Sequence, residues 1–137
     1  MLQDQTLKNL LTHAAQQRTN LGKDIDAYRL FNGFYEGLPG IVLDRYADTL
    51  VILDHRDPSE SQTVIDEVEK WAVDHLDWVG SVLLKQRIHS DQRLKNGILV
   101  HGQEIAQSIH EYGVHYALDL QMNQDASFYL DTRNLRR

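Results

Sequence analysis

The sequence contains no cysteine, only two prolines and no long uninterrupted apolar run. Without cysteine the chain has no disulfide framework, no thiolate metal site and no cysteine nucleophile, and a cytoplasmic location is expected. Its apolar runs are shorter than the ~18 residues that a membrane span needs, and the N-terminal MLQDQTLKNL lacks the layout of a signal peptide, so no membrane partner is expected. At 137 residues the chain has the length of one domain, or of one domain with an appended element.

Positive charge is scarce and unevenly placed along the chain. The 14 Lys and Arg residues face 20 Asp and Glu residues, and the net charge of −6 argues against non-specific polyanion binding by the whole domain. Residues 1–84 hold 7 basic and 14 acidic residues, whereas residues 85–137 hold 7 basic and 6 acidic residues. An anionic partner is therefore expected to approach the second stretch, although ordinary solvated side chains are the alternative. Its basic residues are Lys85, Arg87, Arg93, Lys95, Arg133, Arg136 and Arg137.

The pattern of apolar residues predicts an α+β fold with a mainly antiparallel sheet, one long packed helix and an N-terminal helix. Helical spacing favours a helix over residues 5–18. The segment Asp57–Glu60 has the composition of a helix start, and an apolar stripe continues from it to about Asp77. Apolar, β-branched or alternating segments favour strands. These are residues 28–31, 41–43, 49–53, 81–87, 98–100, 104–111, 114–121 and 128–130.

Motifs for self-contained chemistry are missing from this sequence. The seven histidines form no H-E-x-x-H pair, and no serine stands in a G-x-S-x-G elbow. The glycine-containing stretch 32–40 lies between two predicted strands and does not open a helix, so it is neither a dinucleotide fingerprint nor a P-loop. Its glycines are interpreted as supplying permissive backbone angles in a tight connection. We therefore predict no catalytic residue and no metal ligand.

Two segments of the chain contain the motifs of one known family. Residues 28–48 read YRLFNGFYEGLPGIVLDRYAD, and residues 123–136 read NQDASFYLDTRNLR. They resemble the signatures R-L-x-N-G-E-x-D-G-L-P-G-L-x-V-D-R-Y-G-D and N/G-Q-x-x-G-x-F-L-D-x-R-x-x-R of bacterial class I S-adenosylmethionine-dependent methyltransferases that modify large-subunit ribosomal RNA, the PUA-linked, cytosine-5 methyltransferase-like group. Residues 105–120 match the strand pair of the family, so the resemblance covers roughly residues 27–137. Ser127 stands where the family usually has Gly, and Leu135 interrupts its polar run.

The resemblance implies a three-part enzyme, of which this chain matches the central, strand-rich part. It divides the chain into an N-terminal helix at residues 1–22, a central α+β domain at 23–121, and a junction at 122–137 leading into a catalytic domain that the chain lacks. S-adenosylmethionine is then the cofactor of the full-length enzyme, and no tight binding to this chain alone is expected. By resemblance, the edge of the cofactor and RNA cleft contains Gln124, Phe128, Asp131 and Arg133.

The final predicted strand agrees with such a junction. Phe128 and Leu130 are apolar and are followed at once by Asp131 and several arginines, so the strand needs a partner surface and its end suits a polar pocket or an anion. The alternative makes Phe128 and Leu130 core residues and the arginines a solvated tail.

The resemblance therefore predicts a non-catalytic N-terminal and central portion of an RNA methyltransferase. This portion positions the RNA substrate, which the resemblance implies is ribosomal RNA, and packs on its own C-terminal catalytic domain. The residues expected to contact RNA are Lys85, Arg87, Arg93, Lys95 and Arg136. A free-standing RNA- or protein-binding module of the same ancestry is the alternative, and a homodimer formed through the terminal strand is a third hypothesis.

Overall fold

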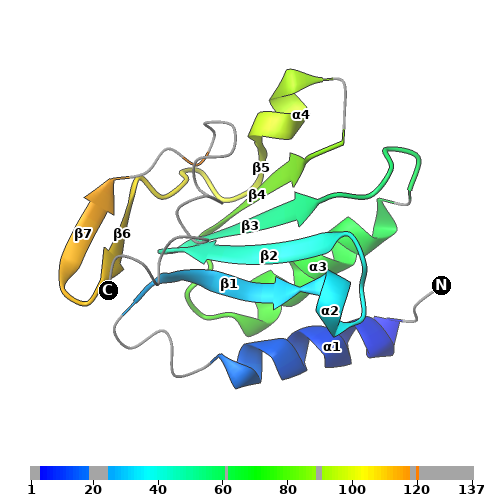
Figure 1. The fold of residues 1–137 in the computed structure, drawn as a ribbon, viewed down its shortest axis with the longest axis horizontal. Helices are drawn as coiled ribbons and strands as arrows, with labels where there is room; N and C mark the ends of the chain where they lie inside the picture. The colour runs from blue at the N-terminus through cyan, green and yellow to red at the C-terminus, as the bar shows by residue number, and fades with distance from the viewer. Residues whose placement is uncertain (1–3, 19–24, 61, 89–90, 118–119, 121–137) are drawn as a thin grey trace.

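The computed structural model describes residues 4–18, 25–60, 62–88, 91–117 and 120. It is a mixed α/β structure in which a five-stranded sheet carries helices and a separate two-stranded hairpin lies at one end (Figure 1). This confirms the predicted α+β class. The elements in chain order are α1 (Asp4–Gln17), β1 (Ala27–Asn32), α2 (Gly33–Glu36), β2 (Ile41–Tyr46), β3 (Thr49–Asp54), α3 (Thr63–His75), β4 (Ser81–Gln86), α4 (Gln92–Asn96), β5 (Ile98–His101), β6 (Ser108–Glu111) and β7 (Val114–Ala117).

The main sheet has the strand order β1-β2-β3-β4-β5. Neighbouring strands are antiparallel except β3 and β4, which run parallel with Thr49 opposite Ser81. A parallel pair needs a crossover connection, and α3 supplies it by returning the chain to the start of β4. The predicted mainly antiparallel sheet is therefore confirmed. As a result, β1, β3 and β4 run in the same direction, and their C-terminal ends lie at the same end of the sheet.

Helices α1 and α3 pack on one face of this sheet. The two-residue period of the strands directs residues such as Leu43 and Ile52 toward the helices, where they share one core with Leu11 and Trp71. Ala14 of α1 and Val68 of α3 are also fully buried in it. Helix α1, which the sequence sets apart as its own segment, is thus part of the same hydrophobic core as the strands.

The opposite face of the sheet is apolar as well. Ala27, Val42, Val51 and Leu83 project to it and form a second buried cluster together with Ile109 and other residues. Burial on both faces explains why β3 reads TLVILD without the polar alternation of a half-exposed strand.

Helix α3 begins later than the sequence predicts. The Asp57 carboxylate, expected to cap the helix, instead accepts hydrogen bonds from the backbone N–H and the hydroxyl of Ser59, at 2.9 and 2.7 Å. The N–H of Glu60 donates to the Asp57 carbonyl, which closes a local turn. Aspartate readily stabilises such turns, and here this competes with capping. The helix starts at Thr63 behind Gln62, which makes no side-chain capping bond.

The connection between β1 and β2 contains the one-turn helix α2, which was not predicted. Asn32 caps it by accepting from the N–H of Phe34 at 3.1 Å, and Gly37 ends it with a φ of 106°. That angle lies in the left-handed region, which glycine adopts without steric cost. The predicted role of the glycines in this connection is therefore confirmed at Gly37.

The second hairpin differs from its predicted extent. Strand β6 begins at Ser108 and not at residue 104, and β7 is described over Val114–Ala117 of the predicted 114–121. Val114, the first residue of β7, is apolar but 49% exposed. The hairpin lies beside the sheet rather than in it (Figure 1). Within the described ranges, no helix is both long enough and apolar enough to cross a membrane.

Candidate nucleic-acid interface

The described basic residues that the sequence predicts to contact RNA lie on β4, on α4 and between them. Arg93 of α4 projects outward with 85% of its side chain exposed and pairs with Asp91 at 3.2 Å. Lys95, on the same helix, is half-buried. Lys85 is only 3% exposed, because it lies on the face of β4 that is buried in the interior. Lys85 therefore lies in the protein interior, away from the exposed surface that an RNA backbone can reach.

Arg87 connects β4 to α4. Its Nη1 donates to the Lys95 carbonyl at 2.9 Å, and its backbone N–H donates to the Asp54 carbonyl at 2.9 Å. These bonds tie Arg87 to Lys95 of α4 on one side and to the end of β3 on the other. Arg87 is therefore a half-buried positioning residue for α4 as well as a source of positive charge.

His55 follows β3 at the same edge of the sheet and was not predicted as a site residue. Burial lowers the pKa of His55 below its ordinary value, the positive charge of Arg87 lowers it further, Asp54 opposes this, and Arg29 adds a smaller lowering effect. Since these charges act on the imidazole, Arg29 and Arg87 lie within electrostatic range of it. The structure thus brings two arginines that are 58 positions apart in sequence close enough to affect one histidine.

Ion pairs fix the groups around this histidine. Arg29 binds Asp44 on the neighbouring strand through Nε–Oδ1 at 2.8 Å and Nη2–Oδ2 at 3.2 Å, and Asp44 is only 1% exposed. Arg56 binds the Asp54 carboxylate in the same two-pronged way, at 3.0 and 3.2 Å. Paired arginine–carboxylate geometry of this kind is directional and strong. The side chains at this edge are thus held in fixed positions.

An exposed aromatic residue completes the edge. The Phe34 ring of α2 lies 5.8 Å from the His55 ring, and 54% of Phe34 is exposed. The backbone N–H of His55 donates to the Gly40 carbonyl at 2.7 Å, which joins the loop after β3 to the loop before β2. We name the set Arg29, Phe34, His55, Arg87, Arg93 and Lys95 the aromatic–basic edge. Aromatic rings beside arginine and lysine are the groups that contact single-stranded RNA.

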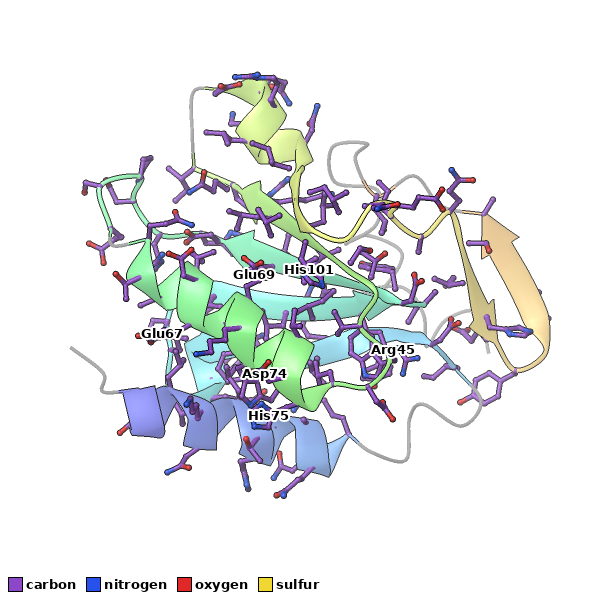
Figure 2. All side chains as sticks on the ribbon, turned by 180° about the vertical axis from the view of Figure 1, so that it is seen from behind. Arg45, Glu67, Glu69, Asp74, His75 and His101 are labelled. Carbon is purple, nitrogen blue, oxygen red and sulfur yellow. The ribbon has the colours of Figure 1, made fainter. Side chains whose placement is uncertain are left out.

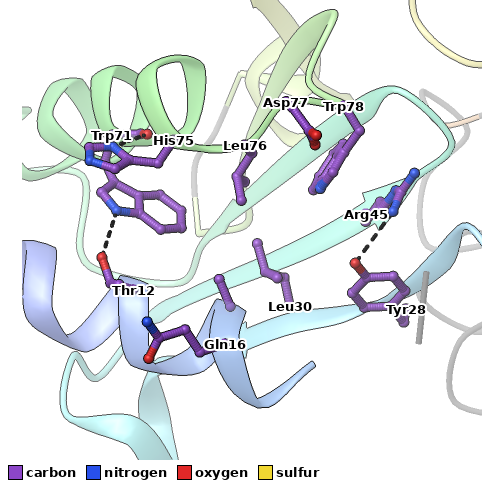
Figure 3. A pocket seen from close by; sticks show the side chains of 11 residues that line it. Thr12, Gln16, Tyr28, Leu30, Arg45, Trp71, His75, Leu76, Asp77 and Trp78 are labelled. Atoms are coloured by element: carbon purple, nitrogen blue, oxygen red, sulfur yellow. Dashed lines mark hydrogen bonds between the residues drawn. The ribbon is translucent and has the colours of Figure 1, made fainter. Parts of the chain in front are cut away.

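The opposite end of the sheet contains a cavity of about 520 Å³ between α1, α3 and the first two strands (Figures 2 and 3). The Arg45 guanidinium lies 4.4 Å from the centre of the Trp78 ring and 5.7 Å from that of Tyr28. Its Nε donates to the Ala47 carbonyl at 2.9 Å, within the β2–β3 turn. Arg45 thus helps to fix the turn of the β2–β3 hairpin, whereas Asp44 is bonded to Arg29 of β1.

Several predicted site residues lie outside the described part of the chain. They are Gln124, Phe128, Asp131, Arg133 and Arg136, together with the predicted strand at 128–130. Among the described residues no group of three or more His, Cys, Asp or Glu side chains is arranged to hold a metal ion.

The residues that sequence reasoning missed carry different signals. Arg29 and Asp44 both lie in the first motif, and pairing the hairpin strands in register would have placed them opposite each other. Nothing in the sequence marks His55, because its surroundings come from three strands and a loop.

Comparison of folds places the chain among methyltransferase structures. One similar chain, described as "a putative methyltransferase complexed with SAH", gives a TM-score of 0.79 at 22% identity, over 99% of this chain and 35% of that one. Another, described as "a putative sam-dependent methyltransferase from Streptococcus mutans", gives a TM-score of 0.74 at 23% identity, again over 99% and 35%. At these identities the likeness establishes the fold of one region of such proteins.

Sequence comparison names the relatives more narrowly. No protein-family model matches the chain. The Ribosomal RNA large subunit methyltransferase I of Shewanella denitrificans is 31% identical over 138 residues, which cover 88% of this chain and 32% of the relative. The Ribosomal RNA large subunit methyltransferase of Deinococcus radiodurans is 29% identical over 119 residues, covering 83% and 29%. The homologues of this chain are thus ribosomal RNA large subunit methyltransferases, as the two motifs predicted, and the chain spans about a third of their length.

Proposed function

We propose that this chain is a non-catalytic N-terminal and central portion of an S-adenosylmethionine-dependent RNA methyltransferase, in which it positions RNA and packs on a catalytic domain. The observation that carries the proposal is the alignment of 83–88% of the chain with about a third of ribosomal RNA methyltransferases. Ribosomal RNA is accordingly the proposed substrate, and a cytoplasmic location follows from that substrate. A free-standing binding module is not favoured, because these relatives contain the matching region within a longer enzyme.

The proposed RNA contacts are the exposed Arg93 and Phe34 and the half-buried Lys95 of the aromatic–basic edge. Arg93 and Lys95 project from α4, and Phe34 is exposed on α2 at the same edge. Arg29 and Arg87 add positive charge while they hold the edge in place. Phosphate contacts of this kind position an RNA chain, and an exposed ring gives an unpaired base a surface to stack on. Arg136 remains a further predicted contact.

The cofactor is proposed to bind to the full-length enzyme. The resemblance assigns Gln124, Phe128, Asp131 and Arg133 to the edge of its cleft, and none of the described residues is assigned to it. S-adenosylmethionine supplies the methyl group in such an enzyme. Tight binding of the cofactor to this chain alone is not expected, and a homodimer stays a hypothesis that light scattering tests.

Salt-dependent RNA binding tests the proposed interface. We expect the double variant Arg93→Gln/Lys95→Gln to bind a labelled single-stranded fragment of 23S ribosomal RNA more weakly than the unchanged chain. The slope of log affinity against log salt should fall by about 1.4, since each phosphate contact on a single strand contributes about 0.7. Fluorescence anisotropy between 50 and 200 mM salt, roughly the range over which such slopes are resolved, gives both quantities.

A matched control separates local contact from overall charge. The double variant Lys8→Gln/Lys70→Gln removes the same charge from exposed positions on α1 and α3. It should leave the salt slope unchanged. Equal slopes for both double variants would contradict the placement of the RNA interface at α4.

A further inference from the structure

The cavity beside α1 and α3 has the size and walls of a small-molecule site. Its volume of about 520 Å³ lies within the range of roughly 300–1,000 Å³ that is typical of ligand pockets. Leu30 of β1 and Leu76 after α3 form an apolar floor, and Trp71 and Trp78 stand at its two ends (Figure 3). The whole lining comes from α1, α3, β1, β2 and the segment after α3, so the cavity exists only in the folded chain.

The wall at the α1–α3 contact is held in place by hydrogen bonds. The Trp71 Nε1–H donates to the Thr12 hydroxyl at 3.2 Å, and the His75 ring stacks on the Trp71 ring at 5.8 Å and 15°. The His75 Nδ1 lies 3.0 Å from the Trp71 carbonyl. A carbonyl only accepts, so the His75 Nδ1–H donates this hydrogen bond, and Nε2 is left facing away from it.

The other wall offers a donor and an acceptor beside an aromatic face. The Arg45 guanidinium stacks on Trp78 and donates to the Tyr28 hydroxyl at 3.4 Å, which fixes its plane. Asp77, next to Trp78 in sequence, adds a carboxylate to the same cavity (Figure 3). Arginine is a donor only, and an ionised carboxylate is an acceptor only. The rim therefore presents both hydrogen-bonding types above an apolar floor.

These features select among ligand classes. An apolar ligand would cover the Asp77 carboxylate and the Arg45 guanidinium while offering neither a hydrogen bond, which is costly. A free phosphate would meet the Asp77 carboxylate and gain nothing from the rings. A planar heteroaromatic group with donors and acceptors on its edge uses both the rings and the rim, and unpaired nucleobases have this chemistry.

We propose that this cavity, lined by Arg45, Asp77 and the two tryptophans, binds an unpaired nucleobase of RNA. The inference rests on the proposed function, because that function brings RNA to the chain. It adds a second RNA contact at the end of the sheet opposite the aromatic–basic edge. This second contact requires an unstacked base. The proposed site differs from the α4 interface in depending on base and not on phosphate.

Intrinsic fluorescence observes this cavity directly. The chain contains two tryptophans, and both line the cavity. We expect guanosine monophosphate and adenosine monophosphate to quench the fluorescence saturably. A single-stranded purine-rich oligonucleotide should do so at a concentration roughly tenfold or more lower, because it adds phosphate contacts. The blunt duplex of the same sequence should quench at least about tenfold more weakly than the single strand. A linear, non-saturating response to all probes, or equal responses to single strand and duplex, would overturn the proposal.

A pair of matched variants locates the binding. Asp77→Asn removes the acceptor charge from the cavity rim, whereas Asp74→Asn makes the same change three positions earlier, at an exposed residue of α3 that does not line the cavity (Figure 2). We expect Asp77→Asn to lower the mononucleotide affinity by about fivefold or more, which corresponds to the loss of one hydrogen bond to a charged group. Asp74→Asn should leave it unchanged. Equal affinities for the two variants would overturn the assignment.

Two further measurements separate this inference from the proposed function. Arg45→Lys keeps the charge and loses the planar fork, and Gln16→Ala alters the exposed rim on α1 should Arg45→Lys fail to fold. Each should weaken mononucleotide quenching. The Arg93→Gln/Lys95→Gln variant should weaken oligonucleotide binding and leave mononucleotide quenching intact. RNA binding without quenching would refute the nucleobase site alone, whereas quenching by mononucleotides without any RNA binding would refute the proposed function alone.

Discussion

At the scale of single residues, the charge of a side chain predicts its role only when its face of the strand is known. Lys85 and Arg87 are two positions apart on the same stretch, and sequence reasoning treated both as RNA contacts. Lys85 is buried within the sheet and Arg87 is half-buried with its guanidinium on the Lys95 carbonyl. Arg93, which has the same charge, is exposed on α4. Charge could be read from the sequence, but burial could not.

His55 gives a prediction at this scale. Its pKa is lowered by burial and by Arg87, so the folded chain binds the proton less tightly than the unfolded chain, whose value is about 6.5. The stabilising effect is therefore present above about pH 6.5 and is lost as the pH falls through the lower pKa of the folded state. Urea unfolding between pH 7.5 and 5, a window of roughly two units around that value, should show a larger loss of stability for the unchanged chain than for His55→Gln.

Nuclear magnetic resonance provides the control for His55. The imidazole signal of His55 should titrate below the ordinary histidine pKa of about 6.5. Arg87→Gln should move the His55 midpoint upward, because it removes a positive charge that lowers the pKa. A midpoint that does not move would show that burial alone determines the shift.

At the scale of elements, local signals predict the existence of helices and strands better than their ends. The apolar, β-branched residues at 41–43 and 49–53 predicted both strands of the first hairpin, which β2 and β3 confirm. The start of α3 was wrong because Asp57 binds Ser59 in a turn of its own. The parallel pairing of β3 with β4 was not predicted, since strand direction depends on how α3 packs on the sheet.

Gly33 tests the element that was missed, α2. A Cβ atom at this position would lie 1.9 Å from the Leu38 carbonyl oxygen and 2.5 Å from that of Ile41, and both are backbone atoms. Gly33→Ala should therefore lower the free energy of unfolding by about 2–4 kcal/mol through forced backbone movement. Urea denaturation measures the loss. Gly33→Ala should also weaken RNA binding, because Phe34 of the aromatic–basic edge is the next residue in the chain.

Gly113 is the matched control for Gly33. It lies in the β6–β7 turn with a φ of 82°, and no atom lies within 4 Å of an added Cβ. Gly113→Ala should cost only the left-handed backbone strain of about 1 kcal/mol. A loss as large as that of Gly33→Ala would mean that crowding at α2 is not the cause.

At the scale of the whole molecule, helix α1 (Asp4–Gln17) packs in the same core as the sheet. Leu7, Leu11 and Ala14 of α1 are buried in the core that contains β1 and α3. The same helix contributes Thr12 and Gln16 to the cavity. Helix α1 thus serves both the stability of the domain and the proposed nucleobase site, a dual role that its amphipathic pattern alone does not disclose.

Leu11 tests this integration. The residue is 1% exposed, so Leu11→Ala should lower the free energy of unfolding by about 2–5 kcal/mol through lost burial and the cavity left behind. Lys8→Ala, on the exposed side of α1, should change it by less than about 0.5 kcal/mol. If α1 were an independent segment, circular dichroism would show it unfolding separately from the sheet, and Leu11→Ala would leave the main transition unchanged.

The sequence by itself determined the fold class, the main strands and the relatives of this protein. Periodicity reports which side of an element is apolar, and the motifs at residues 28–48 and 123–136 are local in sequence. Only the tertiary structure decided that Lys85 is buried, that Arg29, His55 and Arg87 share one edge, and that both tryptophans line one cavity. These facts depend on strand order and helix packing, which join residues from distant segments. No local pattern of residues encodes such distances, and the further inference is therefore drawn from the fold.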